Sequence, residues 1–530
     1  MEKSILRSNN LKLETHMKAK GLVLMAILIG AVNVSAQRIY YSEPDRDDVR
    51  QLRFEIMGKY NNNYLVYKNN RNRHQIAIYE PDMKLKEKVD LDFIPDRASG
   101  VEIFSSPENS ILFYQHQKKN IVYFMGVQID GNGKTIGEPM ELDTTRLSIF
   151  SDSKVYSVIA SDDKKKFMVF KMRNVRSDDM HIQTLLLSNT LIPIRRSSFI
   201  YNLESNKESI ADFYLDNEGN FLFSHVTRPG QREYISKAKL SVLKTYSDTV
   251  QNFFLTLKEV FLDELRIKVD NTNGRYILSS LYSKGKRGNI DGLFLAFVNK
   301  DLTSDIERAI EFTDEFRDQA KGENNTKMAF NDYYLKHFIV KRDGGVLITG
   351  ESTYTNSRGN NWNRWNNPWM MGSPWNNYWG WNSWNNWGWN GWGWGSPWGG
   401  GFNNFGGPSQ QTRFYADNVM ILALGKDGDM QWNNIVNKAQ YDDNTDNMLS
   451  YQYMNTGGEI LFLYNEWARR TPMLNAQSLT PDGKIKKEPP LKSLDKGYEF
   501  MIRLGKQVGA REMIVPVLYR NMFAFARIEF

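Results

Sequence analysis

Few residues of this chain combine the types and the spacing that catalysis or metal binding requires. The sequence has no cysteine, which excludes thiol catalysis, disulfides and thiolate metal sites. Beyond residue 36 only five histidines occur, and no two of them form an HxH or HExxH pair, so their spacing gives no support for a zinc site. They are His74, His116, His181, His225 and His337. We therefore predict no catalytic residue from the sequence.

One acidic segment follows the start of a calcium loop. Asp442, Asn444 and Asp446 match the D-x-N-x-D opening, in which short oxygen side chains converge on one hard cation. The sixth position is Asn447, where the loop has Gly, and the twelfth is Tyr453, where it has Glu. Two interpretations stay open, a structural calcium ion and a solvated acidic loop.

The most unusual segment is a tract built from Trp, Asn and Gly, which contains twelve of the chain's 14 tryptophans. Gly and Asn favour turns and prolines remove backbone donors, so we expect no regular helix or strand within it. Exposed indoles at this density are costly unless something covers them. We predict that a partner protein or a glycan is bound by the tryptophans of the tract, which are Trp362, Trp365, Trp369, Trp375, Trp379, Trp381, Trp384, Trp387, Trp389, Trp392, Trp394 and Trp398.

The composition of the tract does not separate its targets. Indoles stack on sugar rings, settle at lipid headgroups and anchor protein interfaces. The low charge of the tract slightly disfavours anionic lipid, which clusters of Lys and Arg would recognise. The alternative is a low-complexity loop with little function that grew by repeat expansion, since Gly-Ser-Pro-Trp occurs at both Gly372 and Gly395.

The first 36 residues have the organisation of an export signal. Lys18 and Lys20 precede a short apolar run, and small residues at 34–36 suit cleavage. The run is shorter than the ~20 residues that a membrane-spanning helix needs. We predict an upstream extension at 1–16 and a signal peptide at 17–36, with no transmembrane segment after cleavage. The mature chain is then exported to the periplasm or the surface of a Gram-negative-type bacterium.

The charge of the chain does not point to nucleic acid. The formal net charge of +7 falls to about +4 without residues 1–36, which hold five basic and two acidic residues. No basic stripe accompanies it, so we expect no nucleic-acid partner. Gly133-Lys134-Thr135 imitates the end of a phosphate loop, but Gln128 stands where that loop has Gly, and we predict a turn.

After the signal, one unit of about fifty residues recurs. Each copy has an apolar strand, a tight turn, a second apolar strand, a polar loop and two further strands. The longer intervals contain insertions, which are a charged and partly helical-looking segment at 301–325 and the tract at 355–414. The first turn of each unit stands at Asn62, Asn109, Asp163, Gly219, Gly274, Gly344, Gly457 and Gly509.

Four short antiparallel strands per unit are typical of a propeller blade. We predict an all-β fold, a β-propeller of about eight (alternatively seven) four-stranded blades, as a single domain over 37–530 with a disordered insertion at 355–414. The last unit shows only three strands, and RIYY at Arg38 is the candidate for the fourth, which would latch the ring. The chain resembles exported bacterial β-propellers in architecture over most of 38–530, without a Trp-Asp or kelch signature.

The rival architecture is an outer-membrane barrel, because residues 522–530 alternate as a lipid-facing strand does. Charged residues in the strands RIKVD and FMIRL disfavour it.

We expect a non-enzymatic binding or scaffold protein of the cell envelope, without a cofactor other than the calcium candidate. One alternative is a polysaccharide-active hydrolase or lyase, in which carboxylates such as Asp212 and Glu264 converge in a central channel. The other is a subunit of an outer-membrane-associated complex. The sequence does not predict an oligomeric state.

Overall fold

A computed structural model of the chain describes residues 37–45, 52–70, 73–147, 154–174, 179–205, 207–230, 233–321, 328–357, 412–443, 446–468, 471–490, 497–520 and 522–530. The predicted extension and signal peptide at 1–36 lie outside these residues, as do Asn444 and every tryptophan of the tract.

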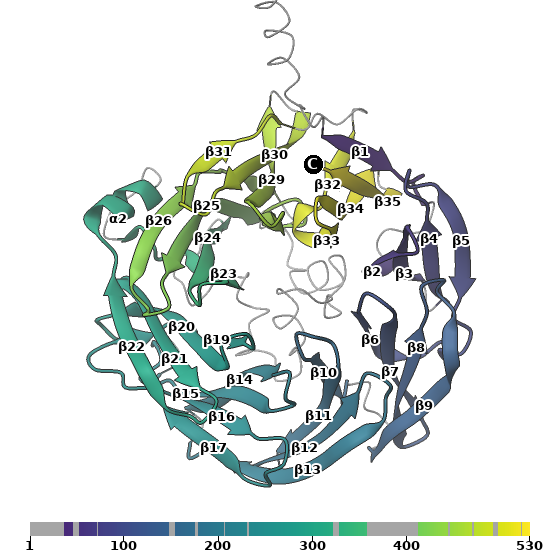
Figure 1. Ribbon diagram of the computed structural model, residues 1–530, viewed down its shortest axis with the longest axis horizontal. Helices are drawn as coiled ribbons and strands as arrows, with labels where there is room; N and C mark the ends of the chain where they lie inside the picture. Colours follow the sequence, from purple (N-terminus) through teal and green to yellow (C-terminus); the bar gives the residue numbers. More distant parts are fainter. Residues whose placement is uncertain are drawn as a thin grey trace, which may run out of the picture.

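The described strands form eight separate antiparallel sheets, which follow one another around a ring (Figure 1). Each sheet is a blade that runs from an inner strand near the centre of the ring to an outer strand at the rim. The predicted propeller of eight blades is therefore confirmed. Eight separate sheets also exclude the single continuous sheet that the rival architecture requires.

Each of the first four blades has four strands in chain order. Blade 1 consists of β2 (Leu52–Tyr60), β3 (Asn63–Asn70), β4 (Arg73–Tyr79) and β5 (Leu85–Asp90). Blade 2 consists of β6 (Ser99–Ser105), β7 (Ser110–Lys118), β8 (Ile121–Ile129) and β9 (Thr135–Arg146). Blade 3 consists of β10 (Ser157–Ala160), β11 (Lys166–Asn174), β12 (Asp179–Ser188) and β13 (Pro193–Asn202). Blade 4 consists of β14 (Glu208–Leu215), β15 (Phe221–Thr227), β16 (Lys237–Leu243) and β17 (Val250–Phe254).

Three of the remaining blades contain an additional short strand. Blade 5 consists of β18 (Phe261–Leu262), β19 (Arg266–Asp270), β20 (Arg275–Ser283), β21 (Gly292–Asn299) and β22 (Ser304–Glu311). Blade 6 consists of β23 (Tyr333–Val340), β24 (Val346–Ser357), β25 (Thr412–Leu424), β26 (Met430–Val436) and β27 (Tyr441–Asp443). Blade 7 consists of β28 (Tyr451–Asn455), β29 (Ile460–Ala468), β30 (Thr471–Leu479) and β31 (Ile485–Lys487). Blade 8 consists of β32 (Tyr498–Phe500), β33 (Lys506–Gly509), β34 (Glu512–Tyr519), β35 (Met522–Glu529) and the N-terminal β1 (Arg38–Tyr41), with the short 3-10 helix η5 (Ile502–Leu504) between β32 and β33.

The hydrophobic core lies between blades and not within any one of them. Among the described residues, each of the eight core clusters joins two neighbouring blades. The cluster that joins blades 8 and 1 includes Leu52, Tyr64, Met501 and Phe523, so the apolar contact is continuous around the ring. A single twisted sheet cannot cover both of its own faces, and packing against two neighbours covers them.

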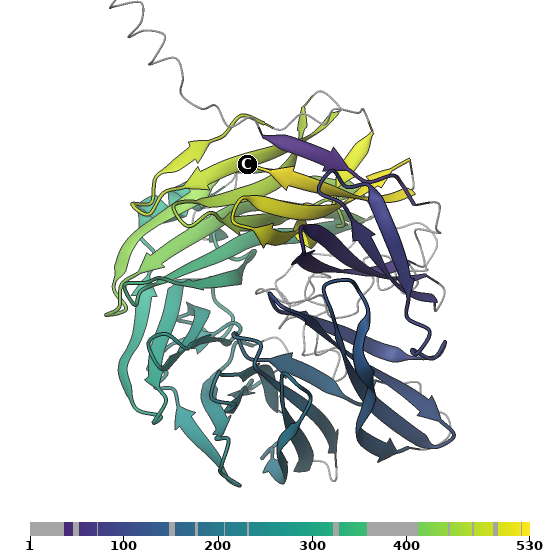
Figure 2. The ribbon, with the colours of Figure 1, turned by 45° about the vertical axis from the view of Figure 1, so that its right-hand side comes forward.

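The N-terminus closes the ring. β1 pairs antiparallel with β35 from Arg38↔Glu529 to Tyr41↔Ala526 and supplies the outermost strand of blade 8 (Figure 2). The aromatic ring of Tyr41 also stacks on that of Tyr498, with centroids 4.2 Å apart. The predicted latch is thus confirmed, and it protects an edge of β35 that would otherwise stay unpaired.

Most of the inner strands are interrupted. A shift of register occurs within the first strand of blades 1, 2, 4 and 6. In blades 5 and 8 two short segments pair with one neighbour in place of a single strand. Bulges of this kind bend a strand and redirect side chains.

The segment at 301–325 is partly helical, as predicted, but its first part is not an insertion. Its first part is β22, the regular fourth strand of blade 5, because Ile306 and Ile310 alternate toward the core that blades 5 and 6 share. Helix follows only in α2 (Asp314–Ala320), which Thr313 caps by accepting from the N–H of Phe316. Among the described residues, no helix is both long and apolar enough to cross a membrane.

Candidate functional site

The tryptophan tract is inserted between two strands that are longer than their counterparts. β24, the second strand of blade 6, has 12 residues, whereas the second strands of the other blades have 7 to 9. β25, the third strand, has 13 residues, whereas the third strands of the other blades have 7 to 10. Three or more additional residues at about 3.3 Å each extend the hairpin by roughly 10 Å. The ends of the tract meet at the tip, where Ser357 pairs with Thr412. Parts of the predicted insertion at 355–414 are therefore paired strand.

We refer to the end of this hairpin, residues 353–357 and 412–416 together with β27, as the stem. β27 pairs with β25 from Arg413↔Asp443 to Tyr415↔Tyr441 and makes the stem three-stranded. The cross-strand pair Tyr354 and Tyr415 stacks with centroids 4.5 Å apart and planes 9° apart. These aromatic and threonine residues suit strands, which is why the chain stays extended here.

Polar contacts fix the third strand of the stem. The Nε and NH2 groups of Arg413 donate to the two oxygens of Asp443 at 2.7 and 3.0 Å, which is a bidentate pair. The same guanidinium lies 4.7 Å from the ring centroid of Tyr441. The Tyr354 hydroxyl donates to Asp417 at 3.0 Å. The stem therefore holds the two ends of the tract side by side.

A buried charge cluster anchors the base of the stem. Lys438 and Glu351 both have side chains with 0% exposure, and their charged atoms lie 2.7 Å apart. Lys438 also donates to the carbonyl oxygen of Ala416 in β25, at 2.7 Å. Ser450 donates to Glu351 at 2.5 Å. Burial lowers the pKa of Lys438. For Glu351, burial alone would raise the pKa, but the attraction of Lys438 and then of Lys336 outweighs burial and leaves its pKa below the usual value.

The calcium candidate lies directly beside the stem. Asp442 belongs to β27 and Asp446 pairs with Arg503 at 2.7 Å, while Asn444 lies outside the described residues. Burial, followed by repulsion from Glu499, raises the pKa of Asp442 to about 7. No group of three or more His, Asp or Glu side chains in the described ranges is arranged to hold a metal ion. The structural calcium stays a prediction that needs the metal itself to test it.

The structure brings together the two carboxylates that the sequence singled out, Asp212 and Glu264. Asp212 lies at the bulge of β14 in left-handed backbone (φ 52°), and Glu264 lies between β18 and β19. Each carboxylate approaches a different terminal nitrogen of Arg266 at 3.6 Å. Burial is the main cause that raises the pKa of both carboxyl groups, against the attraction of Arg266. One oxygen of each, Oδ2 and Oε1, has no hydrogen-bond partner among the described residues.

The five histidines do not converge. His74 bonds to the Tyr67 hydroxyl through Nδ1 at 2.5 Å, and His225 bonds to the Tyr201 hydroxyl and to Glu208. The others contact neighbours on their own or adjacent blades: His116 stacks on Tyr123, His181 bonds to Arg173 and Ser198, and His337 contacts Tyr451 and Tyr453. Gly133-Lys134-Thr135 belongs to the turn between β8 and β9, as predicted.

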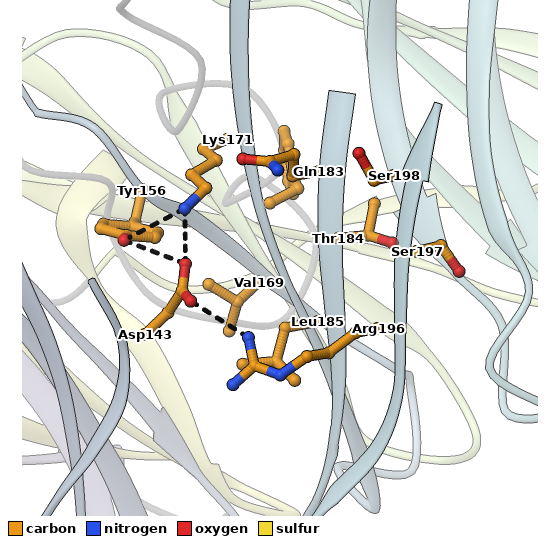
Figure 3. A pocket seen from close by; sticks show the side chains of 11 residues that line it. Asp143, Tyr156, Val169, Lys171, Gln183, Thr184, Leu185, Arg196, Ser197 and Ser198 are labelled. Carbon is orange, nitrogen blue, oxygen red and sulfur yellow. Dashed lines mark hydrogen bonds and ion pairs between the residues drawn. The ribbon is translucent and has the colours of Figure 1, made fainter. Parts of the chain in front are cut away.

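A polar pocket that the sequence did not predict lies between blades 2 and 3 (Figure 3). Its volume is about 200 Å³. Asp143 of β9 accepts from Lys171 at 2.7 Å, from the Tyr156 hydroxyl at 3.0 Å and from Arg196 at 3.0 Å. Burial opposes ionisation of Asp143, but these partners outweigh burial and lower its pKa. The walls are completed by Val169, Phe170, Gln183, Thr184, Leu185, Ser197 and Ser198.

Comparison with known proteins supplies no function. No protein-family model matches the chain, and no curated protein gives a significant match. The chain is similar to a structure from an analysis of two prolyl endopeptidases, with a TM-score of 0.41 and 8% identity over 89% of this chain and 56% of that one.

Two further solved structures show the same low level of likeness. Prolyl oligopeptidase B from Galerina marginata, bound to a 25mer macrocyclization substrate, gives a TM-score of 0.38 and 9% identity over 90% of this chain and 57% of that one. A Synechocystis apocarotenoid oxygenase mutant gives 0.32 and 7% identity over 72% of each chain. The chain spans little more than half of the peptidases, and we transfer no site or activity from any of these proteins.

Proposed function

We propose that the protein is a non-enzymatic binding or scaffold module of the cell envelope, exported by its N-terminal signal. In this proposal the ring is a rigid support and the tryptophan tract is the binding element. The observation that carries it is the pairing of Ser357 with Thr412 at the tip of an elongated hairpin. The stem thereby holds the two ends of the tract next to each other at its tip. The tract's lack of Lys, Asp and Glu favours a neutral glycan or a protein surface as partner.

Three features of the stem support a presenting role. It is longer than the corresponding part of the other blades, it gains a third strand through β27, and its base is held by the buried pair of Lys438 and Glu351. A functionless low-complexity loop would need none of these contacts. A structured base instead limits the orientations of the tract and lowers the entropy that is lost on binding.

The test is a variant in which Asn-Gly replaces residues 358–411. A two-residue Asn-Gly turn suits the closing of an antiparallel hairpin, so the paired ends at Ser357 and Thr412 can be joined directly. A matched control carries a Gly/Ser segment of the same length in place of the tract. We expect both variants to keep the circular dichroism spectrum and urea midpoint of the full chain.

Binding is measured by co-sedimentation with purified peptidoglycan and insoluble polysaccharides, and by pull-down from a detergent extract of envelope membranes. We expect the full chain to bind one of these and both variants to lose that binding. Retention of a membrane protein would favour the complex-subunit alternative within the same proposal. Equal retention of the full chain and both variants would contradict the proposal.

The second candidate function is a polysaccharide-active enzyme, and one observation favours it. Asp212 and Glu264 come from neighbouring blades and meet at Arg266, each with a raised pKa and an unpartnered oxygen. Two carboxyl groups on one sugar linkage are the usual machinery of glycoside hydrolysis. Reducing ends released from a polysaccharide panel by the full chain, and not by Asp212→Asn, would establish this function. The absence of release by the full chain would exclude it for the polysaccharides tested.

A further inference from the structure

The pocket between blades 2 and 3 is bounded by one strand of blade 2 and three of blade 3. β9 contributes Asp143, while β11, β12 and β13 contribute Lys171, Gln183 and Arg196 (Figure 3). At about 30 Å³ per water, its volume of about 200 Å³ corresponds to roughly seven water molecules. That is room for one small organic molecule and not for a drug-sized ligand or a peptide chain.

The charge of the pocket is positive. Two cations, Lys171 and Arg196, lie against one carboxylate, Asp143. The ammonium of Lys171 is fully used, because it donates to Asp143 at 2.7 Å, to the Thr145 hydroxyl at 2.8 Å and to the carbonyl oxygen of Thr144 at 3.3 Å. Lys171 thus fixes and neutralises Asp143. The uncompensated charge of the pocket is that of Arg196.

Arg196 has more N–H donors than the two hydrogen bonds it makes among the described residues. A guanidinium has five N–H groups in a fixed fork. Arg196 uses one on Asp143 at 3.0 Å and one on the carbonyl oxygen of Leu142 at 2.7 Å. Its side chain is 55% exposed, so the remaining N–H groups reach solvent. A planar donor set of this kind matches a carboxylate.

The neighbouring polar groups are also oriented as donors. Nδ1 of His181 lies 3.2 Å from the Nε–H of Arg173 and accepts from it, so the ring proton of a neutral imidazole is on Nε2. Burial, followed by the charges of Arg173 and Lys171, lowers the pKa of His181 and favours that neutral form. Nε2 then donates to the Ser198 hydroxyl at 2.7 Å, which leaves the Ser198 O–H free to donate into the pocket.

The amide of Gln183 completes the set. Gln183 pairs directly with Lys171 on one side and with Ser198 on the other, so its side chain belongs to the same row. It makes no side-chain hydrogen bond to any residue in the described part of the chain. Donors from Arg196, Ser198 and Gln183 therefore face one small space that has no uncommitted carboxylate.

From this arrangement we infer that the pocket binds a single carboxylate-bearing sugar residue, of the size of a uronic acid. The carboxylate pairs with Arg196, and the ring hydroxyls accept from Ser198 and Gln183. A cation is disfavoured by the two positive side chains of the pocket. An apolar ligand would offer these donors no acceptor. The site is independent of the tryptophan tract and of the function proposed for the tract.

Saturation-transfer NMR and calorimetric titration with D-glucuronate test the inference. D-glucose and acetate serve as controls that lack the carboxylate and the hydroxyls respectively, and inorganic phosphate is added as a competitor. We expect glucuronate to bind at least ~10-fold more tightly than glucose, which cannot form the charge-assisted pair with Arg196, and more tightly than acetate, which cannot contact Ser198 and Gln183. A tri-uronide that binds more tightly than the monomer would identify a polymer end as the source. Equal affinities would identify the free sugar.

Two variants on the same strand locate the site. Arg196→Gln removes the proposed carboxylate contact, and we expect at least a ~10-fold loss of glucuronate affinity. Arg195→Gln is the matched control, because Arg195 pairs with the exposed Asp248 and does not line this pocket. The Asn-Gly variant that lacks the tract should bind glucuronate like the full chain.

Each of four results would overturn the inference. These are no glucuronate binding, glucose binding as tight as glucuronate binding, unchanged affinity in Arg196→Gln, and displacement of glucuronate by an equal concentration of phosphate. Loss of glucuronate binding in the tract-free variant would also overturn it, while leaving the function proposed for the tract untouched.

Discussion

Asp45→Ala should weaken the seam at which the ring closes. Asp45 follows β1, and its backbone N–H donates to the carbonyl oxygen of Phe523 in blade 8 at 2.7 Å. Its carboxylate pairs with Lys68 of blade 1 and, at 3.4 Å, with Lys88. The side chain of Lys68 is only 4% exposed and its ammonium lies 5.1 Å from the ring centroid of Phe525. This one carboxylate therefore neutralises a cation buried between the first and last blades.

The size of the effect follows from the burial of Lys68. Removing one partner of a buried ion pair costs about 3–5 kcal/mol, because the remaining charge is left uncompensated. Lys68 keeps the Tyr79 hydroxyl at 2.7 Å and the face of Phe525, so we expect the lower end, about 3 kcal/mol. Adding Lys68→Met should restore about 2 kcal/mol of that loss, because the buried charge is then removed as well.

Urea unfolding of the four proteins in this double-mutant cycle provides the measurement. Burial opposes ionisation of Asp45, but the attraction of Lys68 and Lys88 outweighs burial and lowers the Asp45 pKa. The wild-type advantage is therefore fully present above the ordinary pKa of a carboxyl, near 3.9, and is lost as the pH falls through the lower folded value. A loss under about 0.5 kcal/mol at pH 7, or no recovery in the double variant, would refute this reasoning for the seam.

Three further substitutions test the charges of the core. Burial lowers the pKa of His74 to about 4, so the unfolded chain takes up the proton first as the pH falls. The free energy of unfolding should therefore decrease between pH 6.5 and pH 4. In His74→Gln we expect this decrease to be smaller by about 1–2 kcal/mol after screening, as measured by urea titrations at both pH values. Glu351→Gln leaves Lys438 and Lys336 without their counter-charge, so we expect the free energy of unfolding to fall by about 3–5 kcal/mol. Proteolysis at the stem should also be faster. An unchanged urea midpoint would contradict the role of this buried pair as an anchor. The pKa of Asp442 is raised to about 7 in the folded chain, so folding favours its protonated form and stability is lost as the pH rises to that value. Asp442→Asn should therefore stabilise the fold by about 1 kcal/mol at pH 8 and by little at pH 4. Thermal melts with and without calcium would show whether calcium stabilises the wild type and not the variant.

Much of the ring could be predicted from the sequence because tight turns leave a local signature. Gly219, Gly274, Gly344 and Gly457 all have positive φ and all lie in turns that join an inner strand to the next strand. Together with the first turns at Asn62, Asn109, Asp163 and Gly509, and with the longer intervals assigned to insertions, they gave the number of blades. The latch was predictable as well, since the last repeat lacked one strand and an apolar strand was free at the N-terminus.

The remaining features depend on contacts that periodicity does not contain. The strand at Ser304–Glu311 has enough charge to look helical, and only its pairing with β21 makes it a strand. The bulge that places Asp212 beside Arg266 is a local departure from the alternation on which a strand prediction rests. Ion pairs such as Lys438 with Glu351 join residues far apart in the chain, so no short pattern marks them.

The polar pocket between blades 2 and 3 was not predictable from the sequence for a similar reason. Lys171, Gln183 and Ser198 are consecutive neighbours across three strands, yet in sequence they are ordinary polar residues of alternating strands. The only available signal was a cluster of polar positions on β11 and β13, which any solvent-facing strand shows. The packing of blade 2 against blade 3 turns that surface into a pocket.

We propose above all that the tryptophan tract makes the binding contact. The composition of the tract allows this contact to be measured directly. Trp432 and Trp467 are the only other tryptophans of the chain, so 5-fluorotryptophan in a Trp432→Phe/Trp467→Phe variant labels the tract alone. Fluorine NMR is then recorded with the peptidoglycan or envelope extract that retains the full chain. We predict that the tract resonances shift or broaden in proportion to the fraction bound. Retention of the labelled protein with every tract resonance unchanged would contradict the claim.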